Sequence, residues 1–365
     1  MSLTVLWTAG ITAAVAVLLS AVARWLALKY KVVDVPKVAR KIHKRPTALL
    51  GGAAVILAFF VGVALAWPHL IGGYMLPKHL IGLMIGACFV LVGGVLDDKF
   101  DLSPKLQIVF PVLAVLSVIV AGIGIDYITN PFGGVLQLDT FEVEVFSIAG
   151  MPYYFTILAD LFTLAWLMGM MYTTKFLDGL DGLVSGVTVI GAVIIAVLSM
   201  TSIVYQPETA HLSLLAAAAF FGFLCLNWHP ARIFLGESGA LFAGFILGVL
   251  GIISGGKIAT TLLILGIPIL DVLWVIIRRL FLEKRSPFKG DRKHLHLRLI
   301  DIGLSQRQAV LVLYAFTTIF GVSSLFLQSR SKVAALAVMG VTMLVLGAVI
   351  VRQYRRRQKE LKEKS

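Results

Sequence analysis

The chain is divided into a series of apolar runs, most of them long enough to cross a lipid bilayer. A membrane-spanning helix needs about 20 predominantly apolar residues, and such runs recur throughout the 365 residues. Only 14% of the residues are charged, against about 25% in a typical soluble domain. The sequence therefore predicts an all-α polytopic membrane protein. Its first run is expected to be a retained helix and not a cleaved signal peptide.

Hydropathy predicts about eleven transmembrane helices within one domain, residues 1–351, followed by a basic tail, residues 352–365. The predicted helices lie near residues 3–28, 49–67, 80–96, 105–125, 155–173, 183–204, 211–227, 239–254, 258–281, 308–327 and 333–351.

Positive charge is distributed unevenly between the segments that join these runs. The chain has a formal net charge of +13, and its basic residues collect after the first run, after the ninth run and in the tail. Residues 126–154 contain neither lysine nor arginine. The positive-inside rule then places the N-terminus outside and the C-terminus in the cytoplasm. Alternating apolar residues within 135–145 predict a small external β-hairpin.

Five of the 19 acidic residues fall in two short segments at the ends of apolar runs. Asp97, Asp98 and Asp101 follow the third run, and Asp178 and Asp181 follow the fifth. The spacing of the last two predicts that they share one face of a helical turn. Carboxylates are costly at membrane depth, and magnesium prefers oxygen ligands. The pattern favours a cation-dependent site at the cytoplasmic face, with surface carboxylates at helix ends as the alternative.

Two further segments are suited to phosphate binding. Gly236–Gly239, which follows Asn227, forms a glycine-bounded turn that opens a predicted helix and can offer backbone N–H groups. His294, His296 and Arg298 are suited to clamping a diphosphate through charge-assisted hydrogen bonds. The alternative for this second segment is a basic loop that meets anionic lipid. A zinc site is not expected, because no thiolate or third histidine lies nearby.

Taken together, these motifs resemble those of the polyprenyl-phosphate N-acetylhexosamine-1-phosphate transferases. Asp97–Gln107 resembles the family's aspartate-rich motif, and Phe176–Leu183 resembles its second aspartate motif. Gly236–Gly239 is similar to a Gly-Asp-Ser-Gly turn, and the segment with His294 matches the histidine motif. The basic segment that contains Lys44 is similar to the first cytoplasmic loop. The resemblance covers almost the whole chain, in the family's order.

The resemblance implies an eleven-helix enzyme of the bacterial cell membrane that transfers a sugar-1-phosphate from a UDP-sugar to undecaprenyl phosphate. UMP is released, and magnesium is the expected cofactor, with manganese as an alternative. This reaction starts envelope glycans such as teichoic acid, lipopolysaccharide or other cell-wall polymers. A homodimer is a further expectation, and nucleic acid is not an expected partner. The implied residues are Asp97, Asp98, Asp178 and Asp181 for catalysis; Lys44, Asp101, Lys175, Asn227, His294, His296 and Arg298 for substrate binding; and Asp97, Asp98 and Glu237 for metal.

The sequence departs from the family pattern at three positions. Family members usually have asparagine where this chain has Tyr172 and Lys175, and aspartate where it has Glu237. Our hypothesis is that Lys175 pairs with Glu237 and that its ammonium group partly replaces the metal site. The alternatives are a subfamily variant that binds magnesium slightly differently, and an inactive relative.

The sequence leaves alternatives open for the donor substrate and for the class of protein. The separated histidines favour a UDP-GlcNAc-type donor, because the branch that uses UDP-MurNAc-pentapeptide usually has three consecutive histidines. A phospho-MurNAc-pentapeptide transferase and a non-catalytic relative that binds the lipid carrier remain alternatives. A transporter is the rival from another class, but transporters place polar residues near mid-bilayer in broken helices.

Overall fold

A computed structural model describes residues 3–35, 46–130, 133–140, 142–148, 151–202, 204–255, 258–284 and 294–363. The chain is mostly helical, as predicted. The helices are α1 (Leu3–Lys29), α2 (Gly51–Leu70), α3 (Pro77–Phe100), α4 (Pro104–Val120), α5 (Ile157–Leu177), α6 (Leu183–Ser199), α7 (Pro207–Asn227), α8 (Gly236–Ile253), α9 (Ile258–Ile277), the π-helical turn η1 (Arg278–Leu282), α10 (Leu295–Asp301), α11 (Gln306–Phe326) and α12 (Ser329–Glu363).

Nine helices in the described part of the chain are long and apolar enough to cross a membrane. Two shorter apolar helices, α4 and α6, occupy the other two predicted runs. The protein is therefore a polytopic membrane protein, whereas the count of eleven spans stays a prediction. The helix α10 was not predicted, because it is short and lies in a polar segment. α12 continues into the basic tail as far as Glu363.

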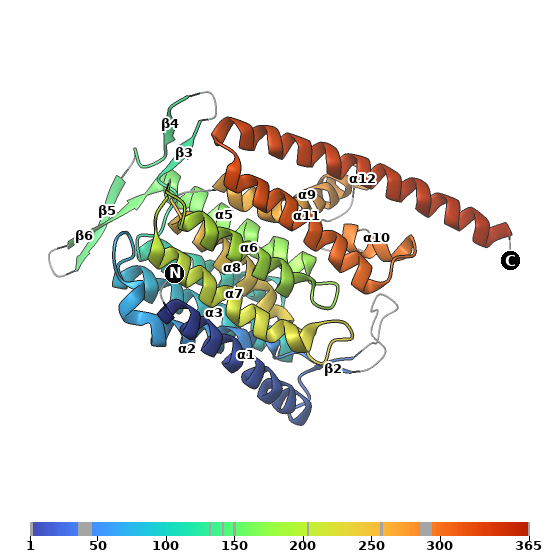
Figure 1. The fold of residues 1–365 in the computed structure, drawn as a ribbon, viewed down its shortest axis with the longest axis horizontal. Helices are drawn as coiled ribbons and strands as arrows, with labels where there is room; N and C mark the ends of the chain where they lie inside the picture. Colours follow the sequence, from blue (N-terminus) through green and yellow to red (C-terminus); the bar gives the residue numbers. More distant parts are fainter. Residues whose placement is uncertain are drawn as a thin grey trace.

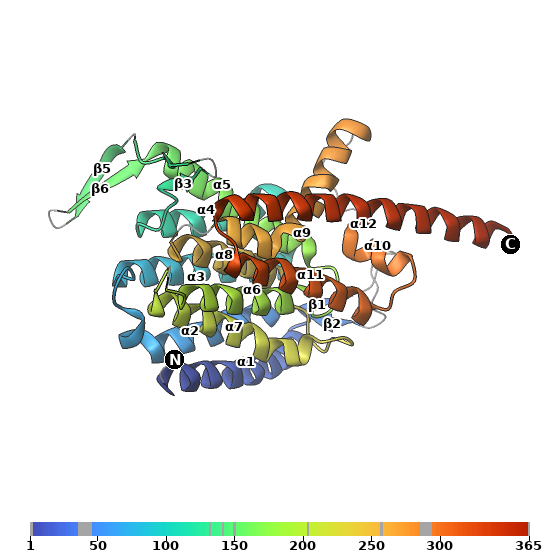
Figure 2. The same ribbon diagram turned by 45° about the horizontal axis from the view of Figure 1, so that its top comes forward.

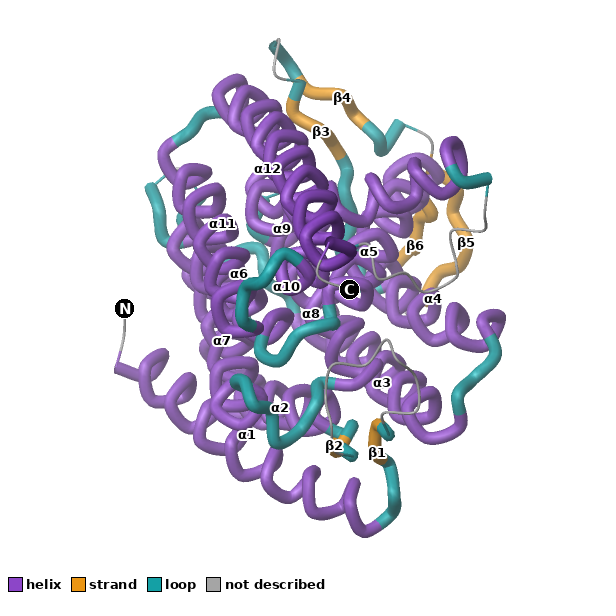
Figure 3. The backbone as a smooth tube through the Cα atoms, turned by 90° about the vertical axis from the view of Figure 1, so that its right-hand side faces the viewer, coloured by secondary structure: helices purple, strands orange, loops and turns teal. Residues whose placement is uncertain are grey.

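The helices lie side by side in a bundle whose two ends differ (Figure 1). The N-terminus and the strands β3 to β6 lie at one end. The C-terminus, α10 and the small sheet of β1 (Val33–Asp34) and β2 (Thr47–Ala48) lie at the other, which Figure 3 views end-on. This opposite placement of the termini agrees with an odd number of spans. The orientation in the membrane stays a prediction.

The predicted single hairpin is in fact two hairpins. In the first, β3 (Tyr127–Thr129) pairs with β4 (Val135–Gln137). In the second, β5 (Glu142–Ile148) pairs with β6 (Met151–Thr156). The prediction failed because Gly133 and Gly134, with φ of 131° and 76°, lie in the turn between β3 and β4. Because of this turn, β4 pairs with β3, the strand that precedes it in the chain.

Helix α8 is buried almost all round in the centre of the bundle and packs against α2, α3, α5 and α6. Small residues make this packing possible. A side chain at Gly94 of α3 would overlap Ser238 of α8, and one at Gly244 of α8 would overlap the backbone of Met170 in α5. The close approach brings the C-terminal end of α3 against the N-terminal end of α8. The two motifs that carry Asp98 and Glu237 therefore meet.

Helices α9 and α12 extend beyond the rest of the bundle. Figure 2 shows the end of α9 turning away from the other helices and α12 running past them toward the C-terminus. α10 lies in the space between these two projections and α11.

Candidate active site

The aspartate motif of α3 meets the glycine turn of α8 through a hydrogen bond. The backbone N–H of Glu237 donates to the carboxylate of Asp98, at 3.0 Å to Oδ1 and 3.2 Å to Oδ2. The first N–H groups of a helix have no partner within it, so a carboxylate at this position is favourable. Gly236 has a φ of 70°, and a side chain there would overlap Asp98 and the carbonyl oxygen of Leu49. Glycine is therefore required at this position.

Asp97 holds the turn between α3 and α4. Its Oδ1 accepts the backbone N–H of Leu102 at 2.8 Å and the side-chain amide of Gln107 at 3.1 Å. Asp101, the residue at which α3 ends, has a φ of 51° and donates its N–H to the carbonyl oxygen of Asp97 at 2.9 Å. Asp97 is thus fixed in orientation, and Asp101 lies exposed at the edge of the site.

Lys175 forms an ion pair with Glu237, which confirms the pairing predicted from the sequence. The ammonium group also donates to Oε1 of Gln107 at 3.4 Å, and Gln107 in turn bonds Asp97. A continuous polar network therefore links the aspartate motif to Glu237. The ammonium lies 5.5 Å from the centroid of the Tyr172 ring, so the two positions that usually carry asparagine contact each other here.

Asp178 and Asp181 do not share a helical turn, contrary to the prediction. α5 ends at Leu177, and both aspartates lie in the connection to α6. Gly179 and Gly182 lie in this connection. Gly182 has a φ of 79°, which lies outside the right-handed helical region. The spacing of three residues therefore does not place Asp178 and Asp181 on one face of a helix.

Asp178 is the exposed member of the acidic cluster, which we define as Asp97, Asp98, Asp178, Asp181 and Glu237. The residue keeps exposed surface, yet the surrounding protein displaces much of the water around its carboxylate. This desolvation, together with the negative charges of Glu237 and Asp181, raises the pKa of Asp178 to about 7. Asp178 can therefore bind or release a proton near neutral pH.

Asp181 anchors the connection between α7 and α8. Its Oδ2 lies 2.7 Å from Nδ1 of His229 and accepts the backbone N–H of Ala231 at 3.0 Å. The carboxylate is thus engaged by the protein, although it belongs to the same cluster. We assign it mainly to fixing the shape of the site.

Asn227 is buried, and its side chain bonds to the protein at both ends. Its Oδ1 accepts the N–H of Gly182 at 3.0 Å and the hydroxyl of Ser185 at 2.9 Å, and its Nδ2 donates to the carbonyl oxygen of Ile233 at 2.9 Å. These bonds join the start of α6 to the segment before α8. The geometry favours a positioning role for Asn227 over the predicted contact with substrate.

The histidine motif is attached to α9 through Asp271. Nδ1 of His294 lies 2.9 Å from Oδ2 of Asp271, and Oδ1 of Asp271 accepts the N–H of Leu295 at 2.9 Å. The carboxylate therefore caps the start of α10 and orients the first histidine. The His294 ring stacks on Phe176, with centroids 6.1 Å apart, and this contact brings α10 to the second aspartate motif.

His296 does not provide the predicted positive charge. Its side chain is buried against Gly179, where a larger residue would overlap the ring. Burial lowers the pKa of His296 to about 4; the carboxylate of Asp271 opposes this shift, and His294 adds to it. The ring is neutral at physiological pH. Arg298, two residues further along α10, therefore carries the permanent charge of this motif.

Two predicted segments lie outside the described residues. Lys44 falls in residues 36–45, and the basic residues before His294 fall in 285–293. Their predicted roles remain untested.

The structure also identifies polar residues that the sequence interpretation did not select. Gln107 links Asp97 to Lys175, Asp271 holds His294, and His229 contacts Asp181. Asp271 carried a detectable signal, since it is an acidic residue within an apolar run three residues after Pro268. Gln107 and His229 lie in segments that resemble the family, but their residue types alone give no such signal.

The acidic cluster fits a hard cation that takes part of its coordination from substrate. No group of three or more His, Cys, Asp or Glu side chains is arranged to hold a metal among the residues the structure describes. Magnesium, however, is commonly bound by one or two carboxylates together with phosphate oxygens and water. Asp98 and Asp178 are carboxylates that could supply one or two oxygen donors of this kind. Glu237 already shares its charge with Lys175.

A bundle of apolar helices whose carboxylates, lysine and histidines converge at one end defines an integral membrane enzyme. Comparison with known proteins agrees: residues 80–255 match the model of glycosyl transferase family 4. The chain belongs to glycosyl transferase family 4.

Relatives match the chain over most of its length. It is 32% identical over 320 residues to the "Probable undecaprenyl-phosphate N-acetylglucosaminyl 1-phosphate transferase" of Bacillus subtilis, covering 86% of this chain and 82% of the relative. It is 30% identical over 358 residues to the decaprenyl-phosphate N-acetylglucosaminephosphotransferase of Mycolicibacterium smegmatis, covering 90% and 82%. It is 26% identical to the undecaprenyl-phosphate alpha-N-acetylglucosaminyl 1-phosphate transferase of Thermotoga maritima, covering 84% and 86%.

Proposed function

We propose that the protein transfers N-acetylglucosamine-1-phosphate from UDP-GlcNAc to undecaprenyl phosphate and releases UMP. The observation that carries this proposal is the contact between Asp98 and the start of α8, which gathers the acidic cluster beside the histidine motif. The relatives named above support the acceptor and the transferred sugar. Membership in a transferase family also removes the transporter alternative.

In this reaction an oxygen of the carrier phosphate attacks the phosphorus that bears the sugar. A new P–O bond forms, the pyrophosphate bond to the nucleotide breaks, and its electron pair leaves with UMP. Both reactants are anions, so catalysis depends on positioning and on neutralising phosphate charge. Bound magnesium would offset the charge that accumulates between the two phosphates.

Within this scheme, Asp98 and Asp178 are the carboxylates placed to hold the cation and to orient the carrier phosphate. Asp97, fixed by Gln107, lies beside them as the candidate base. Arg298 supplies the permanent positive charge for the diphosphate. Neutral His296 is suited to orienting neutral or anionic oxygens through a single N–H group, and the His294 ring lies beside it.

We further propose an eleven-span topology with the acidic cluster on the cytoplasmic face of the bacterial cell membrane. The basic residues at this end of the bundle support that orientation through the positive-inside rule. The reaction would then be the first step of an envelope glycan, as teichoic acid or lipopolysaccharide synthesis requires. The single domain over 1–351 and a homodimer are part of the same proposal.

One observation favours a second candidate function. The ion pair of Lys175 with Glu237 places a cation beside the acidic cluster, which suits a non-catalytic relative that binds the lipid carrier. The two functions separate in one assay on the purified protein in nanodiscs with undecaprenyl phosphate and magnesium. UMP release from UDP-GlcNAc, and not from UDP-MurNAc-pentapeptide, supports the proposal. Carrier binding without UMP from either donor supports the second candidate and overturns the first.

A further inference from the structure

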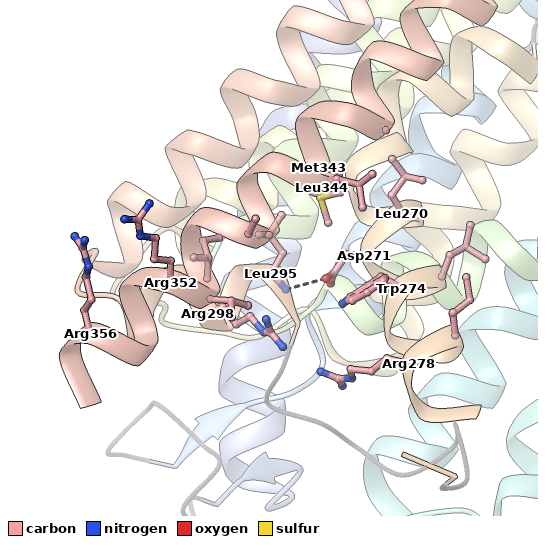
Figure 4. A pocket seen from close by; sticks show the side chains of 17 residues that line it. Leu270, Asp271, Trp274, Arg278, Leu295, Arg298, Met343, Leu344, Arg352 and Arg356 are labelled. Carbon is pink, nitrogen blue, oxygen red and sulfur yellow. Dashed lines mark hydrogen bonds between the residues drawn. The ribbon is translucent and has the colours of Figure 1, made fainter. Parts of the chain in front are cut away.

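A large cavity lies between α9, α10 and α12, and Asp271 forms part of its wall (Figure 4). Its volume is about 1130 Å³. Its walls are mainly apolar and include Leu270 and Trp274 of α9, Leu295 of α10, and Met343 and Leu344 of α12. An apolar space of this size in a membrane protein is suited to hydrocarbon chains.

One end of the cavity is strongly positive. Arg278, Arg298, Arg352 and Arg356 line it, from α9 to η1, α10 and α12, and Figure 4 shows these side chains on the same side of the apolar walls. Among the described residues the lining contains one acidic residue, Asp271, whose carboxylate already bonds His294 and Leu295. Arg278 also pairs with Glu283, with Nε 3.5 Å from Oε1. Guanidinium groups bind phosphate through paired N–H donors, so this end is complementary to a phosphate ester.

The lining residues indicate which molecule fits. Free phosphate or a nucleotide would leave the apolar walls without a partner. A reacting carrier phosphate must reach the acidic cluster, and none of the five residues of that cluster lines the cavity. On its outer side the cavity adjoins the apolar surface of α12, where Leu344 is exposed to the surrounding medium. The occupant is therefore an amphiphile that enters from the bilayer and does not react.

We propose that this cavity binds an anionic glycerophospholipid, with its acyl chains along α9 and α12 and its phosphate beside Arg352 and Arg356. The binding itself does not depend on the reaction assigned above. It has a consequence for the site, however, because α10 carries both Leu295 in the cavity wall and the histidines beside the acidic cluster. A lipid in the cavity would hold α10 in place.

Two variants test the site without altering the proposed catalytic groups. The double variant R352A/R356A removes two exposed charges from the phosphate end. G347W fills the apolar part, where a side chain at Gly347 meets no atom within 4 Å and can enter without a clash. The matched control is K29A/K105A, which removes two exposed lysines from the ends of α1 and α4 at the same end of the bundle.

The full-length protein is purified in neutral detergent and titrated with phosphatidylglycerol or phosphatidylcholine, and bound lipid is counted by native mass spectrometry. We expect wild type and K29A/K105A to retain phosphatidylglycerol at least about tenfold better than phosphatidylcholine, since hydrogen bonds to charged groups are strong. R352A/R356A should lose this preference, and G347W should lose bound lipid altogether.

Equal retention of the two lipids by wild type would overturn the proposal. So would unchanged phosphatidylglycerol binding in both variants. If G347W instead lost undecaprenyl phosphate and kept phosphatidylglycerol, the cavity would hold the carrier and the assignment to a phospholipid would be wrong. None of these readouts requires transferase activity, so a failure of the proposed reaction is detected separately.

Discussion

Lys175 and Glu237, which lie on α5 and α8, form an ion pair at the centre of the acidic cluster. Both residues depart from the pattern that the chain otherwise resembles, and the two departures carry opposite charges. Each change compensates for the other, because an unpaired charge in a half-buried site is costly. The pair therefore defines a variant of the site in which a protein cation lies where a metal ion is expected to bind.

The first prediction is that K175N strengthens magnesium binding. Removing the ammonium frees Glu237 for a metal ion and removes a competing positive charge. We expect the half-saturating magnesium concentration to fall about tenfold, which corresponds to about 1.4 kcal/mol. Calorimetric titration with magnesium in the presence of UDP-GlcNAc measures this directly, with K105N as the control. An unchanged magnesium response in K175N would remove the idea that Lys175 substitutes for metal.

The second prediction concerns Asp271, which we assign as a positioning residue. D271N keeps the size of the side chain but replaces one acceptor oxygen with a donor, so His294 and Leu295 cannot both keep their present bonds. We expect kcat to fall about tenfold or more while the protein stays folded, because the lost bond leaves a buried polar group unpaired.

The control for this prediction is D301N, which changes the same residue type at the other end of α10. Comparing kcat with Tm distinguishes a positioning role from a structural one, since misplaced histidines should lower the kcat of D271N while its Tm stays near that of wild type. An unaltered kcat in D271N would show that the catalytic position of α10 does not depend on the bonds of Asp271.

The sequence predicts the framework of the molecule better than its details. Apolar runs determine where helices form. The family resemblance put Lys175 and Glu237 near one site, and their opposite charges then predicted their contact. The bond between Asp271 and His294 could not be predicted, because one residue lies in an apolar run and the other beyond a polar segment. The arrangement of Asp178 and Asp181 was missed because Gly179 and Gly182 interrupt the helix. The burial that neutralises His296 depends on tertiary packing and has no local pattern.

The third prediction follows from the raised pKa of Asp178, about 7. A cation and a proton compete for this carboxylate. Magnesium affinity should therefore rise about tenfold per pH unit as the pH increases toward 7, and level off above it. Calorimetric titrations across this range measure the slope, and D178N should reduce it. If D178N showed the same pH dependence as wild type, another group would control metal binding.

The fourth prediction concerns stability and His296, whose pKa is lowered from 6.5 to about 4 in the folded protein. The unfolded chain binds a proton more tightly than the folded chain between these two values. Folding stability should therefore be fully retained above pH 6.5 and decrease as the pH falls toward 4. The expected loss at pH 5 is about 2 kcal/mol from this residue.

Thermal unfolding of wild type and H296Q at about pH 8 and pH 5 checks this expectation. The drop in Tm between the two conditions should be smaller in H296Q, while H69Q, which changes an exposed histidine, should behave as wild type. The same drop in H296Q and in wild type would contradict a buried neutral His296.

The central claim is that the acidic cluster built around Asp98 transfers a sugar phosphate to a lipid carrier. The most direct measurement is formation of the lipid-linked sugar pyrophosphate by purified protein from UDP-GlcNAc, undecaprenyl phosphate and magnesium. The expected result is product and UMP in equal amounts with wild type. D98N should give a rate at least about a hundredfold lower, as expected for a charged group at the reacting phosphates. Product formed by D98N at the wild-type rate would contradict the account.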